Sequence, residues 1–229
     1  MKVLVVGEGK HDIGPAEFGA PLGDGRPPRG VVPVLAAEVV PSVDLAASRA
    51  LSWRDIPLLS RDGRAGLDRK VKGAALVARQ RLGCIALVCV HDRDGERNAR
   101  RIESMRQGAV DASGRLPVAC ALAVESIEAW TLGAPGALAA ELGLEPGTMR
   151  RHYDPSRVET LQEGSGKAEK QPKALLERIA AEAHRRDELG LRESVAAQTD
   201  VDELARNCPE GFGTFRGELR EKLGPLGAG

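Results

Sequence analysis

Aromatic residues are scarce in this sequence, and neither sign of charge is in excess. Aromatic residues make up 3% of the 229 positions, so valine, leucine, isoleucine and alanine must fill most of the core. Lysine plus arginine and aspartate plus glutamate both number 33, which gives a formal net charge of zero. This balance argues against a surface that is basic throughout. It does not exclude local basic patches that contact phosphate, because acidic residues elsewhere in the chain cancel the arginines in the net charge.

Cysteine pairs and long apolar runs are also lacking. None of the four cysteines forms a Cys-x-x-Cys pair, which argues against a zinc ribbon. Cys84, Cys89 and Cys120 lie in apolar runs and are predicted to be small buried side chains. No apolar run reaches the length of a membrane span, and the run at residues 3–6 is too short for the core of a signal peptide. We therefore expect a cytoplasmic protein without membrane contact.

Three short apolar runs predict a parallel β-sheet. They cover residues 3–6, 84–90 and 118–124, and each is continuous, as expected for strands buried on both faces. A fourth strand is predicted within residues 31–40, where Pro33 and Pro41 weaken the pattern.

Helical patterns alternate with these runs and continue after them. They cover residues 67–82 (ending at Gly83), 96–107, 126–132, 135–142, 173–189 and 201–223, the last broken near 209–211. Residues 19–30 and 162–172 are predicted to be loops. The order predicts an α/β fold with a mostly parallel sheet flanked by helices. It divides the chain into a core domain of residues 1–132 and a helical C-terminal extension of residues 133–229 that packs on the core.

Acidic residues follow each of the three strands. Glu8 follows the first strand, Asp92 and Asp94 follow the second, and Glu125 follows the third. The carboxyl ends of parallel strands share one edge of the sheet, so these carboxylates converge if the strands are neighbours. Their repulsion would raise their pKa values, and a divalent cation would remove that cost. Oxygen ligands favour Mg²⁺, Mn²⁺ or Ca²⁺ over zinc.

The turn after the first strand has the sequence Gly-Glu-Gly-Lys-His-Asp, at residues 7–12. Its two glycines permit a tight turn and the close approach of a ligand. It is not a phosphate-binding P-loop, which needs Gly-x-x-x-x-Gly-Lys-Ser/Thr. It is not a dinucleotide fingerprint either, since Asp12 stands where the third glycine belongs. Taken alone, the Asp-x-Asp of residues 92–94 also suits a solvated turn, and Asp12 and Glu128 also suit capping or helix-face roles.

The first strand ends in Glu-Gly-x-x-Asp and a later strand ends in Asp-x-Asp, and together they resemble the Toprim domain. Bacterial primases, type IA and type II topoisomerases, small RNA-maturation nucleases and overcoming-lysogenization-defect (OLD) nucleases share this domain. The resemblance covers about residues 1–132 and implies a Rossmann-like catalytic core. Glu8 matches the Toprim glutamate, and Asp92 and Asp94 match its Asp-x-Asp.

Three further motifs resemble a group of small, uncharacterised Toprim-like bacterial proteins. They are Glu-x-x-Glu-Ala-Trp at residues 125–130, Lys-Gln-Pro-Lys at 170–173 and Asn-Cys-Pro-Glu-Gly-Phe at 207–212. Such proteins resemble effectors of bacterial anti-phage or toxin-like systems that work with an ATPase. This chain has no ATP-binding motif, so an ATPase would be a separate partner.

The resemblance implies a Mg²⁺- or Mn²⁺-dependent endonuclease that hydrolyses phosphodiester bonds in DNA or RNA. Glu8, Asp92 and Asp94 would hold one metal ion, Glu125 or Glu128 would help to hold a second, and Asp12 is a further candidate ligand. Lys167 is the candidate catalytic cation, with Lys170 and Lys173 as alternatives.

Several other residues have candidate roles with ordinary alternatives. Lys10, His11 and the arginines at 97, 100 and 101 are candidate phosphate contacts that also suit a solvated surface. His91 is either a residue that orients a ligand or a satisfied strand-end histidine. Trp130 and the only tyrosine, Tyr153, are predicted to be packing residues.

Parts of the Toprim repertoire do not fit this chain. It has no strand-passage domain for a topoisomerase, and it lacks the zinc-binding and helicase-docking modules of a primase. Two alternatives to a nuclease stay open: a non-catalytic metal-binding or regulatory subunit of an ATPase-containing complex, and a phosphotransferase that acts on a small substrate. The sequence does not decide between DNA and RNA, and a homo-oligomer is compatible with it.

Overall fold

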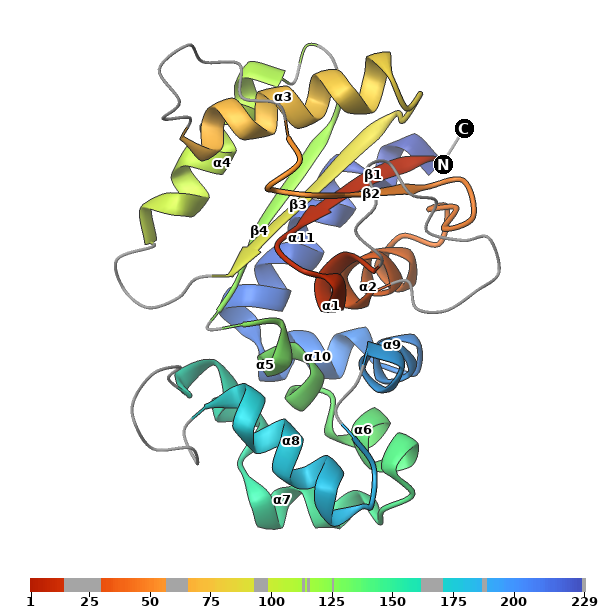
Figure 1. Cartoon of the computed structure of the whole chain (residues 1–229), viewed down its shortest axis with the longest axis vertical. Helices are drawn as coiled ribbons and strands as arrows, with labels where there is room; N and C mark the ends of the chain where they lie inside the picture. The colour runs from red at the N-terminus through yellow and green to blue at the C-terminus, as the bar shows by residue number, and fades with distance from the viewer. Residues whose placement is uncertain are drawn as a thin grey trace.

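The computed structural model describes residues 1–14, 30–56, 66–92, 99–112, 114, 116–124, 126–161, 171–186 and 189–227. Within these ranges the centre of the protein is a four-stranded, all-parallel sheet with the strand order β2-β1-β3-β4 (Figure 1). The strands are β1 (Val3–Gly7), β2 (Arg49–Ser52), β3 (Ala86–Asp92) and β4 (Val118–Ala123). The α/β class and the parallel sheet are therefore confirmed. No helix in these ranges is both long and apolar enough to cross a membrane.

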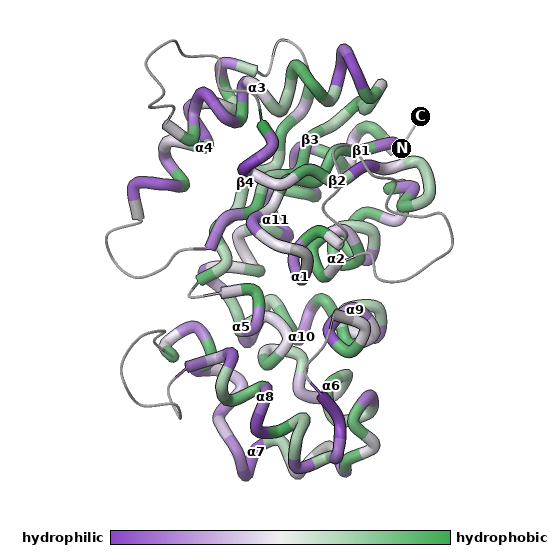
Figure 2. The backbone as a smooth tube through the Cα atoms, in the orientation of Figure 1, coloured by the Kyte–Doolittle hydropathy of each residue, from purple (hydrophilic) through white to green (hydrophobic). Residues whose placement is uncertain are grey.

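The sheet separates two apolar layers because side chains alternate along each strand. Leu4, Leu87 and Cys120 face α3 (Leu67–Gln80) and α4 (Ala99–Ala112). Val3, Val88 and Ala121 face the opposite layer, which contains α2 (Val31–Val39) and α11 (Thr214–Lys222). Figure 1 shows the helices on both sides of the strands, and Figure 2 shows mostly hydrophobic strands beside a largely hydrophilic α4. Burial on both faces explains why the strands have continuous apolar sequences.

The predicted strand within residues 31–40 is wrong, because this segment forms α2. All but two of its nine residues are buried, and a helix buried on most sides has the same continuous apolar sequence as a buried strand. Pro33 lies in the first turn of α2, where a helix tolerates proline. The missing strand is β2, whose sequence Arg-Ala-Leu-Ser is too short and too mixed to stand out.

Most of the remaining helices follow the sequence pattern. The segments 67–82, 126–132 and 135–142 are confirmed as α3, α5 (Ile127–Leu132) and α6 (Pro135–Leu142). The helix expected at 96–107 is confirmed from residue 99 onward as α4, and residues 96–98 lie outside the described ranges. Gly83 has a φ of 61°, as expected for the glycine that ends α3.

The C-terminal segment is helical but differs in detail from the prediction. The single helix expected at 173–189 is wrong: α8 (Pro172–Glu182) ends seven residues early, and α9 (Leu189–Ala197) follows. His184, with a positive φ of 55°, marks the reversal of the chain after α8. The break near 209–211 is confirmed, since the π-helical turn Pro209–Gly213 separates α10 (Val201–Asn207) from α11. The expected loops at 19–30 and 162–172 lie mostly outside the described residues.

Short helical turns complete the described part of the chain. They are α1 (Lys10–Ile13), α7 (Met149–His152) and the 3-10 turns Pro146–Thr148, Pro155–Thr160 and Gly224–Gly227.

The C-terminal segment contributes to the main core. Helix α11 packs against β4 and α2, and its Phe215 and Leu219 share one buried cluster with Val88 of the sheet. Arg106 of α4 and Glu218 of α11 form an ion pair of 3.5 Å that joins the two helix layers beside β4, a strand at the edge of the sheet. The position of the predicted boundary at residue 132 stays a prediction. The four cysteines are buried free thiols, as the sequence predicted for three of them.

Candidate metal centre

The strand order brings Glu8 and Asp92 to the same place at the carboxyl edge of the sheet. Strands β1 and β3 are direct neighbours, with Val6 opposite Cys89, so Glu8 and Asp92 follow at nearly the same level. Glu8 Oε1 accepts a hydrogen bond from the backbone N–H of Asp92 at 3.2 Å. Strand β4 lies on the other side of β3, so the three strands that carry the predicted acids are consecutive in the sheet. The predicted convergence of the acids required these strands to be neighbours, and the strand order confirms that they are.

His91 completes a polar cluster with Glu8. Its Nδ1 forms an ion pair with Glu8 Oε1 and lies 3.0 Å from the carbonyl oxygen of Asp92. Arg101 Nη1 lies 3.0 Å from the same ring nitrogen and donates to the Asp92 carbonyl at 3.0 Å. Two of these three neighbours of Nδ1 are acceptors, which favours a proton on Nδ1 that is donated to Glu8. A contact of His91 with a substrate would then use Nε2.

Trp53 supports His91 from the side of β2. The two ring centroids are 5.9 Å apart, and Trp53 Nε1 donates to the carbonyl oxygen of Val90 at 2.8 Å. Trp53 follows directly after β2, so three adjacent strands contribute to the surroundings of His91. The sequence analysis missed Trp53, because its strand was not recognised.

The surroundings of Glu8 favour the charged carboxylate. Burial raises the pKa of Glu8, but the hydrogen bond and charge of His91, the N–H of Asp92 and the charge of Arg101 outweigh burial and hold the pKa below its usual value. Glu8 is therefore ionised at neutral pH, as a metal ligand must be. Both contacts described above use Oε1, so Oε2 takes part in neither of them.

Asp12 holds the turn that carries Glu8. Its Oδ2 accepts hydrogen bonds from the backbone N–H groups of Glu8 at 3.0 Å and Gly9 at 2.9 Å. Burial raises the pKa of Asp12 to about 6, the charges of Glu128 and Glu8 act in the same direction, and the two N–H groups oppose them. A side chain on Gly7 would place its Cβ 2.6 Å from Ile13 Cγ2, so this turn packs too closely for any residue but glycine. Asp12 shapes the backbone at Glu8, and its role as a ligand stays a prediction.

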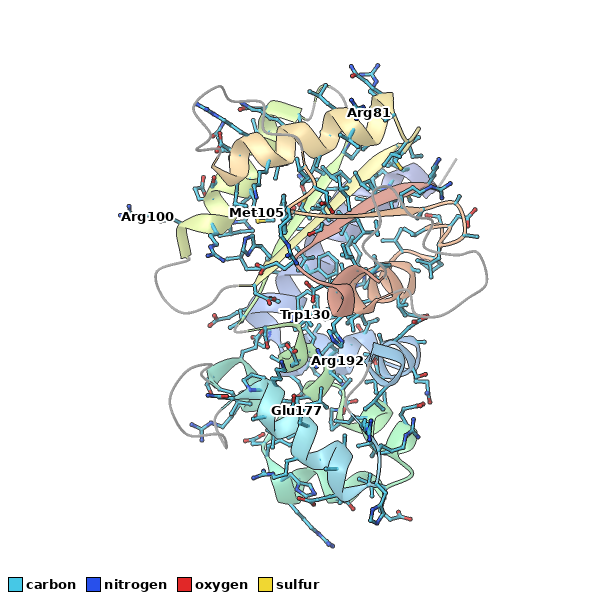
Figure 3. All side chains as sticks on the ribbon, in the orientation of Figure 1. Arg81, Arg100, Met105, Trp130, Glu177 and Arg192 are labelled. Carbon is cyan, nitrogen blue, oxygen red and sulfur yellow. The ribbon has the colours of Figure 1, made fainter. Side chains whose placement is uncertain are left out.

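Glu128 is paired with an arginine that the sequence analysis did not single out. Arg192 Nη1 of α9 donates to Glu128 Oε1 of α5 at 2.6 Å, and the Arg192 side chain is 2% exposed. Burial raises the pKa of Glu128, but the charge and hydrogen bond of Arg192 outweigh burial and leave the pKa below its usual value. The available signal was helical spacing, because Arg192 occupies the same face as the buried Val195 and Ala196. Figure 3 shows Arg192 of α9 near Trp130 of α5.

Three predicted site residues lie outside the described residues: Asp94, Glu125 and Lys167. Lys170 and Arg97 lie outside them as well. Of the other candidate cations, Arg101 contacts the cluster, Arg100 is exposed on α4, and Lys173 is exposed in the first turn of α8. Among the described residues, no group of three or more histidine, cysteine, aspartate or glutamate side chains has the arrangement of a metal site.

The described carboxylates nevertheless supply the type of donor atom, oxygen, that a hard divalent cation prefers. Glu8 and Asp92 supply carboxylates from neighbouring strand ends, and Mg²⁺ and Mn²⁺ prefer oxygen ligands. Asp94 directly follows this edge in sequence, and Glu125 comes two residues after the end of β4. A complete site would therefore combine the two described carboxylates with these two.

The motifs at residues 125–130 and 207–212 are packing partners. The ring of Trp130 lies 5.5 Å from that of Phe212 and 5.4 Å from that of Phe215. Glu159 accepts hydrogen bonds from the backbone N–H of Gly211 at 2.6 Å and of Glu210 at 2.9 Å, which fixes the turn before α11. A Cβ on Gly211 would lie 2.7 Å from Glu159 Oε1 and 2.9 Å from Trp130 Nε1, so only glycine fits. The predicted packing role of Trp130 is confirmed.

Tyr153 is also a structural residue. Its hydroxyl donates to the carbonyl oxygen of Leu132 at 2.7 Å, and burial raises the pKa of the phenol well above its usual value. A partly buried, protonated and hydrogen-bonded tyrosine is a poor nucleophile, in agreement with the sequence prediction.

No protein-family model, curated protein or solved structure matches this chain. Function is therefore inferred from the residues and from their geometry.

Proposed function

We propose that this chain is a divalent-metal-dependent nuclease that hydrolyses phosphodiester bonds in DNA or RNA with Mg²⁺ or Mn²⁺. The observation that carries the proposal is the adjacency of Glu8 and Asp92 at the carboxyl edge of β1 and β3, where Glu8 is held in its charged form. The motif resemblance to the Toprim domain supports the same chemistry. We also propose a cytoplasmic location, a separate ATPase partner and a role in anti-phage defence, which rest on the resemblance alone.

The proposed ligands are Glu8, Asp92, Asp94 and Glu125. A bound Mg²⁺ or Mn²⁺ would polarise the phosphodiester and activate the attacking water. Glu8 would offer Oε2, while Oε1 keeps its contacts with His91 and Asp92. Asp12 would hold the turn that carries Glu8 in shape, and we rank it below the other four residues as a ligand, because its Oδ2 already accepts two backbone hydrogen bonds.

Positive groups beside the ligands would bind the phosphate. Arg101 donates to the Asp92 carbonyl, and this closeness supports a role for its guanidinium as a phosphate contact. Lys167 is the proposed catalytic cation, on the strength of the family analogy. Contacts of this kind supply affinity rather than sequence preference, which suits a nuclease of low specificity.

A cleavage assay tests the proposal. The purified protein is incubated with plasmid DNA, with RNA and with a phosphomonoester, each with Mn²⁺ and with a chelator. We expect Mn²⁺-dependent cleavage of a nucleic acid and no cleavage by a paired Asp92→Ala/Asp94→Ala variant prepared in the same way. Equal cleavage by both proteins would identify a contaminant and reject the proposal. Mn²⁺ binding without cleavage would favour a metal-binding subunit, and hydrolysis of the phosphomonoester alone would favour a phosphotransferase or phosphatase.

Replacing His91 with glutamine is expected to weaken Mn²⁺ binding by about 10–100-fold, the usual cost of losing a residue that orients a metal ligand. The imidazole is expected to orient Glu8, and a flexible amide cannot hold the carboxylate equally well. Isothermal titration with Mn²⁺ measures the change, with His184→Gln on the distant turn after α8 as the control. Unchanged affinity in the His91 variant would show that His91 is only a satisfied strand-end histidine.

A further inference from the structure

Lys70 is held at the same edge of the sheet as the proposed metal site. It lies in the first turn of α3, and its Nζ donates to the carbonyl oxygen of Trp53 at 3.2 Å. The backbone N–H of Trp53 in turn donates to the carbonyl oxygen of Gly7 at 3.0 Å, and Gly7 directly precedes Glu8. The ammonium group of Lys70 is therefore bonded to the stretch of backbone that lies beside Glu8.

Lys70 and Arg101 are on the same face of the sheet. Trp53, which Lys70 contacts, belongs to the apolar layer under α3 and α4, and so does Cys89 of β3. Because side chains alternate along a strand, His91 is on the same face as Cys89, and its ring centroid lies 5.9 Å from that of Trp53. Arg101 of α4 contacts His91 there, with Nη1 3.0 Å from Nδ1. Figure 1 shows α3 and α4 together on one side of the strands, so each of these two helices supplies one cation to the surroundings of His91.

The ammonium group of Lys70 keeps donors for a ligand. An ammonium has three N–H donors, and the Trp53 carbonyl accepts from one of them. Within the described ranges Lys70 forms no ion pair with a carboxylate, whereas Lys72 of the same helix is paired with Asp111. A backbone carbonyl has no net charge, so the positive charge of Lys70 is not neutralised by its partner. A partly buried cation with this remaining capacity suits a phosphate oxygen.

We infer that Lys70 is a phosphate-binding residue, which together with Arg101 receives the backbone of a nucleic acid on the α3 and α4 side of the sheet. This inference rests on the proposed nuclease function, and it names the face from which the substrate reaches Glu8. Cations on two separate helices can contact neighbouring phosphates, which supplies affinity and register without reading the base sequence. The sequence analysis did not single out Lys70, because its place beside the site depends on the unrecognised strand β2.

The variant Lys70→Met tests the inference, because methionine keeps an apolar stem and removes the charge. Fluorescent single-stranded DNA and RNA oligonucleotides are titrated with the full chain in the presence of a chelator, and anisotropy gives the affinity at several salt concentrations. We expect the affinity to fall by about tenfold, the usual cost of losing a hydrogen bond to a charged group. The slope of log affinity against log salt should become shallower by about 0.7, the value for one phosphate contact on a single strand.

Two further variants supply the controls. Lys70→Arg keeps the positive charge and should retain the salt slope of the unaltered protein. Lys72→Met makes the same chemical change two positions along α3, at a lysine that is already paired with Asp111, and should change neither affinity nor slope. Isothermal titration with Mn²⁺, thermal unfolding and Mn²⁺-dependent cleavage are measured on all of these variants, and Lys70→Met should bind Mn²⁺ as the unaltered protein does.

Each alternative result is informative. Oligonucleotide binding by Lys70→Met equal to that of Lys72→Met would overturn the inference, and so would a Lys70→Arg variant that loses the charge-dependent slope. A loss of Mn²⁺ affinity in Lys70→Met would also overturn it, because Lys70 would then act by supporting Trp53 and His91. A shallower slope in Lys70→Met, with no cleavage by the unaltered protein, would support the phosphate contact and reject the nuclease. Absence of both binding and cleavage by the unaltered protein would reject the proposed function and the inference together.

Discussion

Replacing Glu8 with glutamine is expected to slow Mn²⁺-dependent cleavage by at least about 100-fold, because losing even an outer partner of a metal ligand costs about 10–100-fold. Glutamine has nearly the same shape, and its amide oxygen still accepts from the N–H of Asp92 and from His91. The change therefore removes the negative charge while it keeps the turn. The rate is measured under single-turnover conditions, together with Mn²⁺ binding by titration calorimetry.

The matched control is Glu38→Gln, which makes the same chemical change at an exposed position on α2. Its cleavage rate and unfolding temperature should equal those of the unaltered protein. If Glu8→Gln kept full cleavage and full metal affinity, Glu8 would be a structural partner of His91, and the proposed site would lose its central ligand. A fall in cleavage with unchanged Mn²⁺ affinity would place Glu8 in substrate binding instead.

Replacing Trp130 with alanine is expected to lower the free energy of unfolding by about 3–5 kcal/mol, the usual cost of removing a large buried aromatic side chain. Trp130 is 1% exposed and packs against Phe212 and Phe215, so its loss would leave a cavity between α5 and the start of α11. Urea denaturation followed by far-ultraviolet circular dichroism measures the change.

The Trp130→Phe variant serves as the comparison for this prediction. The indole N–H has no hydrogen-bond partner among the described residues, so phenylalanine removes volume without breaking a hydrogen bond. We expect a smaller cost than that of Trp130→Ala, because phenylalanine fills part of the space and the cost of a large-to-small exchange rises with the cavity that is left. A stability of Trp130→Ala equal to that of the unaltered protein would mean that the aromatic cluster does not hold α11 against the sheet.

The sheet could largely be predicted because its strands differ sharply from the rest of the sequence. Continuous apolar runs marked β1, β3 and β4, and the acids after β1 and β3 meet because these strands are neighbours. The segment at residues 31–40 was misassigned because a helix buried on most sides and a strand buried on both faces have the same composition. With β2 missed, the contribution of Trp53 to the site could not be foreseen.

Long-range polar contacts were the least predictable part of the site. Nothing local in the sequence pairs Arg192 with Glu128, because their contact spans 64 positions and depends on the packing of α9 against α5. The orientation of His91 toward Glu8 likewise requires the register between β1 and β3. The residue types in the candidate site could be predicted from the sequence. The partners that set the charge and the orientation of these side chains could be identified only from the fold.

The packing of α11 on β4 has a consequence for how the protein is made. During synthesis β4 leaves the ribosome long before α11, so one face of this edge strand lacks its cover until the C-terminal helices have been added. Unpaired strand edges and open apolar faces are the features that make folding intermediates aggregate. The Arg106–Glu218 ion pair joins the two helix layers beside that strand only when both helices are present. We therefore expect the face of β4 that α11 covers to stay exposed to solvent until α11 has been synthesised.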